Sequence, residues 1–162
     1  MESTLREVSM TIYYDHFETP LGLMEICAGE QAVKSIHFVD RANVPQSNSI
    51  TDLAKCQMLE YFAGGLEEFD LPMEPEGTIF QKQVWRALST IEYGETCSYS
   101  DIANIVKNPK AVRAVGSANG KNPLTIVVPC HRIIGTNGSL TGYASGLERK
   151  AWLLNHEANT LF

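Results

Sequence analysis

The sequence predicts an α+β fold, with an antiparallel three-stranded sheet and one helix in the N-terminal part and a mostly helical C-terminal part. Two observations support this prediction. Short β-favouring runs bounded by glycine and proline occupy residues 11–40, and helix-starting signals recur after residue 75. The segment LPMEPEG, residues 71–77, carries two prolines and a glycine and is typical of a linker. We therefore expect an N-terminal domain at residues 1–75 and a C-terminal domain at residues 76–162.

The N-terminal part is expected to hold three strands and a helix. The strand-like runs are Ile12 to His16, Leu23 to Cys27 and Val33 to Phe38, separated by the turn sequences TPLG and AGEQ. From Ile50 onward, apolar residues recur at helical spacing until Gly64-Gly65, where the helix is expected to end. The expected apolar positions of that helix are Leu53, Ala54, Leu59, Tyr61 and Phe62.

Three helices are expected directly after the linker. Thr78 and Gln81 form a capping-box signal for the first, Ser100 is expected to cap the second, and Asn108-Pro109 to start the third at residues 110–118. Two short helices joined by a tight turn predict a helix-turn-helix in a winged-helix-like arrangement. The second of these two is rich in alanine and glycine, which suits close approach to another surface and equally suits an ordinary buried helix. The expected core positions of the first helix are Phe80, Val84, Trp85 and Leu88.

The charge distribution is asymmetric, although the net charge is −6. Residues 1–101 hold 6 lysines and arginines against 17 acids, whereas residues 102–147 hold five basic residues and no acid. A positive stretch inside an acidic chain is typical of a surface that binds a polyanion. Chance segregation of charge is the alternative that composition leaves open. The five basic residues are Lys107, Lys110, Arg113, Lys121 and Arg132.

Composition argues against several classes of protein. Hydrophobic residues make up 44% of the chain and charged residues 20%, and no apolar run reaches the roughly 18 residues of a membrane helix. The N-terminal sequence has no signal-peptide pattern, so a cytoplasmic or nucleoid location without membrane contact is expected. The cysteines and histidines lack metal-ligand spacing, which predicts no metal and no cofactor. Cys27, Cys56 and Cys97 are expected to be small buried residues.

Cys130 lies in the segment with the clearest candidate chemistry. Residues 125–128 (TIVV) predict a buried strand, followed by Pro129-Cys130-His131-Arg132. A cysteine nucleophile needs a base or a positive field to hold its thiolate, and His131, Arg132 or a helix N-terminus can supply one. Neighbouring residues of a strand point to opposite sides, so His131 is expected to reach the sulfur through a water or a bend. For a lone Cys-His pair, a buried structural cysteine beside a surface histidine is the commoner outcome.

The longer sequence around Cys130 is more specific than the pair. NPKAVRAVGSANGKNP, IVVPCHRIIG and GSLTGYASGLERKAWLLNHE resemble, in order and spacing, the DNA-binding and active-site block of the O6-alkylguanine-DNA alkyltransferases, the methylated-DNA-protein-cysteine methyltransferases. The resemblance covers residues 78–157 closely, whereas for residues 1–75 it rests on a compatible order of strands and helix. It implies an RNase H-like N-terminal domain, a C-terminal domain for DNA binding and catalysis, and repair of O6-alkylguanine in DNA.

The resemblance also implies catalytic roles for individual residues. Cys130 would take the alkyl group irreversibly, one group per protein, while His131 draws the thiol proton through a water. Glu157 would hold that imidazole, in the manner of a Cys-His-acid triad. Asn122 would brace the turn before the active-site segment, and Tyr99 would protonate the departing guanine.

The implied substrate is a base flipped out of double-stranded DNA, which is bound through the minor groove. A monomer is expected, because nothing in the sequence suggests a dimer surface. Arg113 would fill the place that the base leaves. Backbone groups of Cys130, Ile133 and Ala144 would bind the guanine, and Ser145 would narrow the pocket toward bulky alkyl groups. The further residues implied are Lys110, Ala111, Ala114, Lys121 and Arg132 as DNA contacts and Tyr143 as part of the pocket.

Two other functions compete with DNA repair. A helix-turn-helix regulator or damage sensor would use Cys130 as a structural or signalling residue. A Cys-His hydrolase would have His156 as a second candidate base, although the sequence shows no oxyanion-hole glycine motif. The products of incubation with a duplex that contains methylated guanine separate the three functions.

Overall fold

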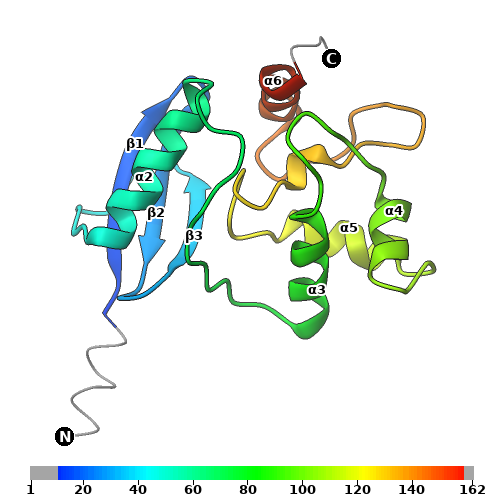
Figure 1. Ribbon diagram of the computed structural model, residues 1–162, viewed down its shortest axis with the longest axis horizontal. Helices are drawn as coiled ribbons and strands as arrows, with labels where there is room; N and C mark the ends of the chain where they lie inside the picture. Colours follow the sequence, from blue (N-terminus) through cyan, green and yellow to red (C-terminus); the bar gives the residue numbers. More distant parts are fainter. Residues whose placement is uncertain (1–10, 159–162) are drawn as a thin grey trace, which may run out of the picture. The chain divides into compact units, whose positions relative to one another are not determined.

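The computed structural model describes residues 11–158 (Figure 1). The chain divides between Glu76 and Gly77 into two compact units. The first unit contains a sheet and one helix. The second consists of helices and a 3₁₀ turn, with no strand among its described residues. The predicted α+β class is confirmed.

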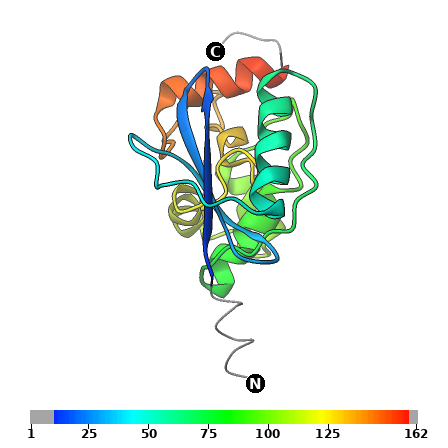
Figure 2. The ribbon, with the colours of Figure 1, turned by 90° about the vertical axis from the view of Figure 1, so that its left-hand side faces the viewer.

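The first unit is built on an antiparallel sheet in the order β1-β2-β3. Its strands are β1 (Tyr13–Thr19), β2 (Gly22–Ala28) and β3 (Val33–Phe38). Helix α2 (Ser49–Phe62) packs against all three strands, and Figure 2 shows it along one side of the sheet. The three predicted strands and the predicted helix are therefore all present.

The register identifies the face of the sheet that meets α2. Asp15 lies opposite Ile26, and Ile26 lies opposite Ile36, so these three side chains share one face. Ile26 and Ile36 are fully buried. Lys55 of α2 forms an ion pair with Asp15 at 3.5 Å, which places the helix on this face.

The buried side of α2 differs from the prediction at two positions. Ala54, Met58 and Tyr61 are fully buried, whereas Leu53 and Leu59 are exposed. Residues at the spacing i, i+4 and i+7 form one stripe of a helix, and 54, 58 and 61 have this spacing. The prediction of Leu53 and Leu59 as core residues is wrong because both positions lie beside that stripe.

The second unit is a set of packed helices. Helices α3 (Ile79–Leu88), α4 (Tyr99–Ile105) and α5 (Val112–Gly120) contact one another, and α6 (Leu147–Ala158) contacts the 3₁₀ turn η1 (Cys130–Arg132). Within the described part of the chain, no helix combines the length and apolar character needed to cross a bilayer.

The first helix of this unit begins as the sequence predicts, and the second does not. Thr78 Oγ1 accepts from Gln81 N at 3.0 Å, and Gln81 Oε1 accepts from Thr78 N at 2.9 Å. Helix α4 is capped by Ser98 and not by Ser100, so that prediction is wrong. Ser98 is the better cap because Asp101, three residues on, accepts a hydrogen bond from Ser98 N at 2.9 Å.

Helix α5 begins two residues later than predicted and has no side-chain cap at Ala111. Residues 108–111 form a turn instead, in which Ala111 N donates to Asn108 O at 2.9 Å. Trp85 Nε1 of α3 donates to Ala118 O at 2.8 Å and holds α5 in place. The pair α4 and α5 thus forms the predicted helix-turn-helix on a support provided by α3.

The predicted strand at residues 125–128 is absent, which is the largest error of the sequence analysis. Thr125 and Val128 form only an isolated bridge, and Ile126 between them has a left-handed backbone with φ 74°. The chain turns at this point and enters η1 at Cys130. The three apolar residues Ile126, Val127 and Val128 indicate burial, and burial is common to strands and buried turns.

Candidate active site

Cys130 is the first residue of η1 and is buried, with 6% of its surface exposed. Its backbone N–H donates to Val128 O at 2.8 Å. Burial raises the pKa of the Cys130 thiol, whereas the side chains of Asn122, Lys150 and Tyr143 lower it. Burial has the larger effect, so the pKa of Cys130 stays above its usual value, and the three polar neighbours offset part of that shift.

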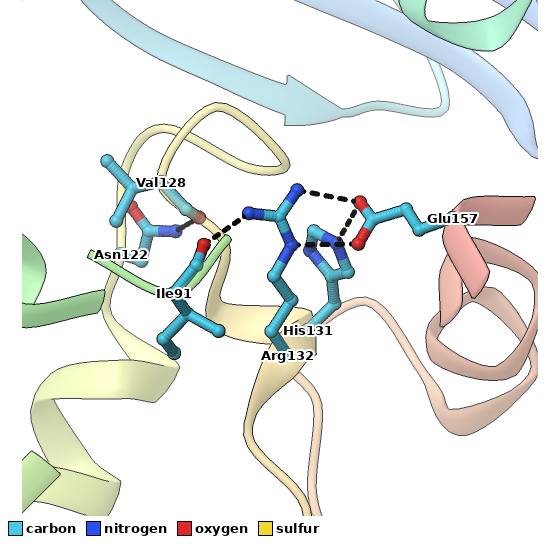
Figure 3. A network of polar contacts seen from close by, with 6 residues as sticks. All are labelled: Ile91, Asn122, Val128, His131, Arg132 and Glu157. Carbon is cyan, nitrogen blue, oxygen red and sulfur yellow. Dashed lines mark hydrogen bonds and ion pairs between the residues drawn. The ribbon is translucent and has the colours of Figure 1, made fainter. Parts of the chain in front are cut away.

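Asn122 holds together the loop that leads to Cys130. Its Nδ2 donates to Val128 O at 2.8 Å and to Leu124 O at 3.3 Å, and its Oδ1 accepts from Leu124 N at 2.9 Å. Figure 3 shows Asn122 and Val128 joined in this way. The side chain takes the place of a neighbouring strand for backbone groups that would otherwise be buried without a partner. The position of Cys130 therefore depends on Asn122.

Glu157 of α6 binds two residues of η1 at once (Figure 3). Glu157 Oε2 lies 2.7 Å from His131 Nε2 and accepts from Arg132 Nη2 at 3.1 Å. Glu157 Oε1 accepts from Arg132 Nε at 2.7 Å, and Arg132 Nη1 donates to Ile91 O at 2.6 Å. All three charged or titratable side chains are buried. The network ties η1 to α6 and to the segment that follows α3.

The network fixes the protonation of His131. Burial lowers the pKa of His131, and Glu157 opposes that shift. Burial raises the pKa of Glu157, but the hydrogen bonds and charges of His131 and Arg132 outweigh it and lower that pKa to about 2. A carboxylate only accepts, so a neutral imidazole donates from Nε2 and keeps a lone pair on Nδ1. Nδ1 is buried, without a hydrogen-bond partner among residues 11–158.

The DNA contact predicted for Arg132 is corrected by this geometry. The Arg132 side chain is 8% exposed, and its donors are directed at Glu157 and Ile91 O. A guanidinium held in this way does not reach a phosphate. Arg132 is instead the residue that orients the Glu157 carboxylate beside His131.

Tyr99, the predicted proton donor, is the first residue of α4 and is half-buried. Thr141 Oγ1 donates to Tyr99 Oη at 3.2 Å. The ring lies over Gly116 of α5, where an added Cβ would be 3.7 Å from Tyr99 Cε1. Tyr99 is therefore positioned by α4, by α5 and by the loop that contains Thr141.

Lys150 is a site residue that the sequence analysis missed. It lies on α6, is fully buried, and donates from Nζ to Thr141 O at 2.7 Å. Burial lowers the pKa of Lys150 to about 8, and the neighbouring Cys130 opposes this shift. One signal could have revealed it: Lys150, Leu153, Leu154 and Glu157 have the i, i+3, i+4, i+7 spacing of a buried helix face.

The residues predicted to line the substrate pocket come from two segments. Ile133 directly follows η1 and is fully buried. Tyr143, Ala144 and Ser145 lie in the loop before α6, where Ala144 is exposed and the other two are half-buried. Burial and the Cys130 side chain both raise the pKa of Tyr143, which places the phenol beside the sulfur. The structure thus brings Tyr143 to Cys130 from a distant point of the chain.

Five of the predicted DNA-binding residues lie on α5 or directly beside it, since Arg113 and Ala114 belong to the helix, Lys110 and Ala111 precede it, and Lys121 follows it. Lys110, Arg113, Ala114 and Lys121 are exposed, and Ala111 is half-buried. We call these five residues the α5 surface. The set holds three cationic side chains, and no acid lies within residues 102–147.

Of the other cysteines, Cys97 pairs through its backbone with the end of η1, where Cys97 N donates to Arg132 O at 3.0 Å. Cys27 and Cys97 are half-buried, and burial raises the pKa of Cys97 to about 11. Cys56 is exposed and donates to Glu60 Oε1 at 3.5 Å, so the prediction that it is buried is wrong. His156 stacks on Trp152 with 4.8 Å between ring centroids. Across residues 11–158, no three His, Cys, Asp or Glu side chains are placed to share a metal ion.

The sequence matches one family over both units. Residues 79–159 match the DNA-binding domain of 6-O-methylguanine DNA methyltransferase, and residues 12–75 match its ribonuclease-like domain. The chain therefore belongs to the 6-O-methylguanine DNA methyltransferase family. The family predicted from the residues around Cys130 is confirmed.

Individual relatives agree over nearly the whole chain. The methylated-DNA–protein-cysteine methyltransferase of Methanosarcina acetivorans is 48% identical over 155 residues, which cover 91% of this chain and 99% of the relative. The constitutive enzyme of the same name from Bacillus subtilis is 48% identical, with 90% and 94% covered. The crystal structure of Mycobacterium tuberculosis O6-methylguanine methyltransferase has a TM-score of 0.84 at 39% identity, covering 92% of this chain and 94% of that chain. The crystal structure of M. tuberculosis OGT in complex with DNA has a TM-score of 0.82 at 42% identity, with 90% and 92% covered.

Proposed function

We propose that the protein repairs O6-alkylguanine in double-stranded DNA by transferring the alkyl group to its own Cys130, as a methylated-DNA-protein-cysteine S-methyltransferase. One observation carries the proposal. In a chain of this family, Cys130 is buried beside Asn122 and Lys150, and the histidine that follows it is held by Glu157. We assign DNA binding and catalysis to residues 76–162, and an RNase H-like fold to residues 1–75.

The transfer is a single in-line displacement at carbon. The Cys130 thiol loses its proton through a water to His131 Nδ1, and Glu157 stabilises the imidazolium that forms. The sulfur then forms a bond to the alkyl carbon while the bond from that carbon to O6 breaks. Tyr99 gives its proton to the departing guanine and regains one from solvent. A thioether has no good leaving group, so each protein molecule accepts one alkyl group.

Two cationic side chains support this chemistry from buried positions. Lys150 favours the Cys130 thiolate through its charge. Arg132 holds both oxygens of Glu157, so the carboxylate keeps its orientation toward His131 Nε2 when the imidazole takes up the proton. Neither residue contacts the guanine in this scheme.

DNA binds to the α5 surface through the minor groove, and the target base leaves the stack to reach Cys130. Arg113 fills the place that the base leaves, since it is exposed on α5 between small residues. Lys110 and Lys121 bind phosphates on either side. Lesion recognition therefore depends on phosphate contacts and on the pocket, with little reading of base sequence.

The flipped guanine lies between η1 and the loop before α6. Backbone carbonyls of Cys130 and Ile133 accept from its amino group, and the amide near Ala144 donates to O6. Tyr143 and Ser145 limit the space for the alkyl group. We propose that one monomer performs the whole reaction.

The experiment is intact-mass measurement after incubation with a duplex that contains O6-methylguanine. We expect a mass gain of one methylene unit, located on Cys130 by peptide mapping, and none for Cys130→Ser. Transferred label should plateau at one methyl group per protein. Tight binding without an adduct would favour a damage sensor, and repeated acyl-type turnover would favour a hydrolase.

A further inference from the structure

Thr141 connects two groups of the proposed site that are distant in the sequence. Its hydroxyl donates to Tyr99 Oη at 3.2 Å, and its carbonyl accepts from Lys150 Nζ at 2.7 Å. Tyr99 lies at the start of α4, and Lys150 lies on α6 beside Cys130. Thr141 is therefore the link between the proposed proton donor and the cation next to the proposed nucleophile.

The separation of the two hydroxyl groups suits proton transfer. A hydroxyl can donate or accept, and Thr141 Oγ1 lies 3.2 Å from Tyr99 Oη, within reach to donate its one hydrogen to that oxygen. With Thr141 as the donor, the Tyr99 hydrogen is available for a base in the pocket. When Tyr99 gives up that hydrogen, its oxygen becomes an anion, and a hydrogen bond to an anion is stronger than one to a neutral oxygen.

We propose that Thr141 is a positioning residue for alkyl transfer: its hydroxyl orients Tyr99 and stabilises the phenolate that forms as guanine departs. This inference rests on the proposed function, in which Tyr99 protonates the leaving group. The contribution of Thr141 grows between the substrate complex and the transition state, so it raises the rate of the chemical step and leaves DNA affinity unchanged.

The surroundings hold Thr141 in position for this role. Lys150 is fully buried, so the carbonyl of Thr141 is fixed to the interior of the unit by a charged donor. On the other side, the Tyr99 ring is backed by Gly116 of α5. The hydroxyl groups of Thr141 and Tyr99 are therefore held in place from different elements. Both side chains are ordered before the reaction, so the chemical step carries no cost for ordering them.

The test compares Thr141→Val, which keeps the shape and removes the hydroxyl, with Thr141→Ser, which keeps the hydroxyl. Single-turnover methyl transfer from O6-methylguanine duplex, at saturating DNA, should slow about tenfold to hundredfold in the valine variant. The serine variant should recover most of the rate. Alkylation of Cys130 by iodoacetamide, followed on its own peptide, serves as the control. Iodide leaves without a proton, so Thr141→Val should react with iodoacetamide at the rate of the unchanged protein.

A double-mutant comparison separates positioning from a purely structural effect. In the Tyr99→Phe background no phenolate forms, so Thr141→Val should cause no further loss of rate. If methyl transfer and iodoacetamide alkylation slow equally in Thr141→Val and Thr141→Ala, Thr141 only supports the loop and the inference is wrong.

The same measurements distinguish failure of the inference from failure of the proposed function. Absence of a methyl adduct on Cys130 in the unchanged protein, or full activity of Tyr99→Phe, overturns the assigned reaction. A normal adduct with a slow Tyr99→Phe, together with a Thr141→Val rate equal to that of the unchanged protein, overturns the role of Thr141 alone.

Discussion

Arg113 and Arg132 belong to the same acid-free segment, yet the fold gives them opposite surroundings. Arg113 is exposed on α5, among small residues. Arg132 is buried and donates to Glu157 and to Ile91 O. A count of basic residues treats the two as equal members of one positive surface. The comparison teaches that such a count predicts a DNA contact only for residues that the fold leaves in water.

The largest difference is expected when a variant of the α5 surface and a variant of the catalytic site are compared on duplex DNA and on free alkylguanine. Tyr99→Phe removes a proton donor and should slow repair of duplex and reaction with free alkylguanine alike, by about a hundredfold to ten-thousandfold. Arg113→Ala should slow only duplex repair, because a free base needs no flipping. Single-turnover rates of both variants on both substrates provide the four values. Equal losses for Arg113→Ala on the two substrates would show that Arg113 does not act in base flipping.

The two arginines should also differ in their effect on folding. Arg132→Met leaves the buried Glu157 carboxylate with His131 alone and should destabilise the protein by about 3–5 kcal/mol. Arg113→Met, the matched control on α5, should change stability by no more than about 0.5 kcal/mol. Urea unfolding followed by circular dichroism measures both. Similar losses for the two variants would contradict the contrast.

The buried network of His131, Arg132 and Glu157 should make the free energy of unfolding depend on pH. The pKa of Glu157 is lowered to about 2, so its unfolded form binds a proton at a higher pH than its folded form does. Its stabilisation is complete above pH about 4.5 and is lost as the pH falls toward about 2; it is on the order of 3 kcal/mol. Unfolding curves of the unchanged protein and Glu157→Gln should therefore converge as the pH falls through this range. A constant difference between them would exclude linkage through Glu157.

The smallest effect is expected for a single lysine on the salt dependence of DNA affinity. With Arg132 buried, the exposed cations of the acid-free segment are Lys107, Lys110, Arg113 and Lys121. Neutralising three to four phosphates gives a slope of about −3 for log affinity against log salt concentration with duplex DNA. Lys121→Gln should reduce the steepness by about one. Fluorescence anisotropy with undamaged duplex at several salt concentrations measures the slope, and a slope near zero would remove the α5 surface from DNA binding.

The fold was predictable where its cause is local. The three strands are separated by recognisable turn sequences, and Thr78 with Gln81 supplies both halves of a capping box within four residues. The prediction failed where a side chain outside the apolar pattern decides the structure. Residues 125–128 turn instead of forming a strand, and Asn122 satisfies Leu124 O and Val128 O at the two ends of this turn.

The same distinction applies to the site. The residues around Cys130 could be identified from a contiguous motif that has a known family. Thr141 could not, since a threonine in a polar loop is a typical surface residue, and Lys150 could be found only from its spacing with the buried Leu153, Leu154 and Glu157. The role of Arg132 was missed because its partner Glu157 lies 25 residues further on, and an arginine in a polar segment is expected on the surface.

Asn122, which shapes the loop before Cys130, also bears on how the protein ages. Asparagine deamidates when the backbone nitrogen of the next residue attacks the side-chain carbonyl and closes a cyclic imide. The next residue here is Pro123, whose nitrogen carries no hydrogen, so this route is closed. Asn137, followed by Gly138 in an exposed turn, has no such protection. A protein that reacts once must stay intact until a lesion arrives, and the Asn-Pro sequence gives its active-site loop a long chemical lifetime.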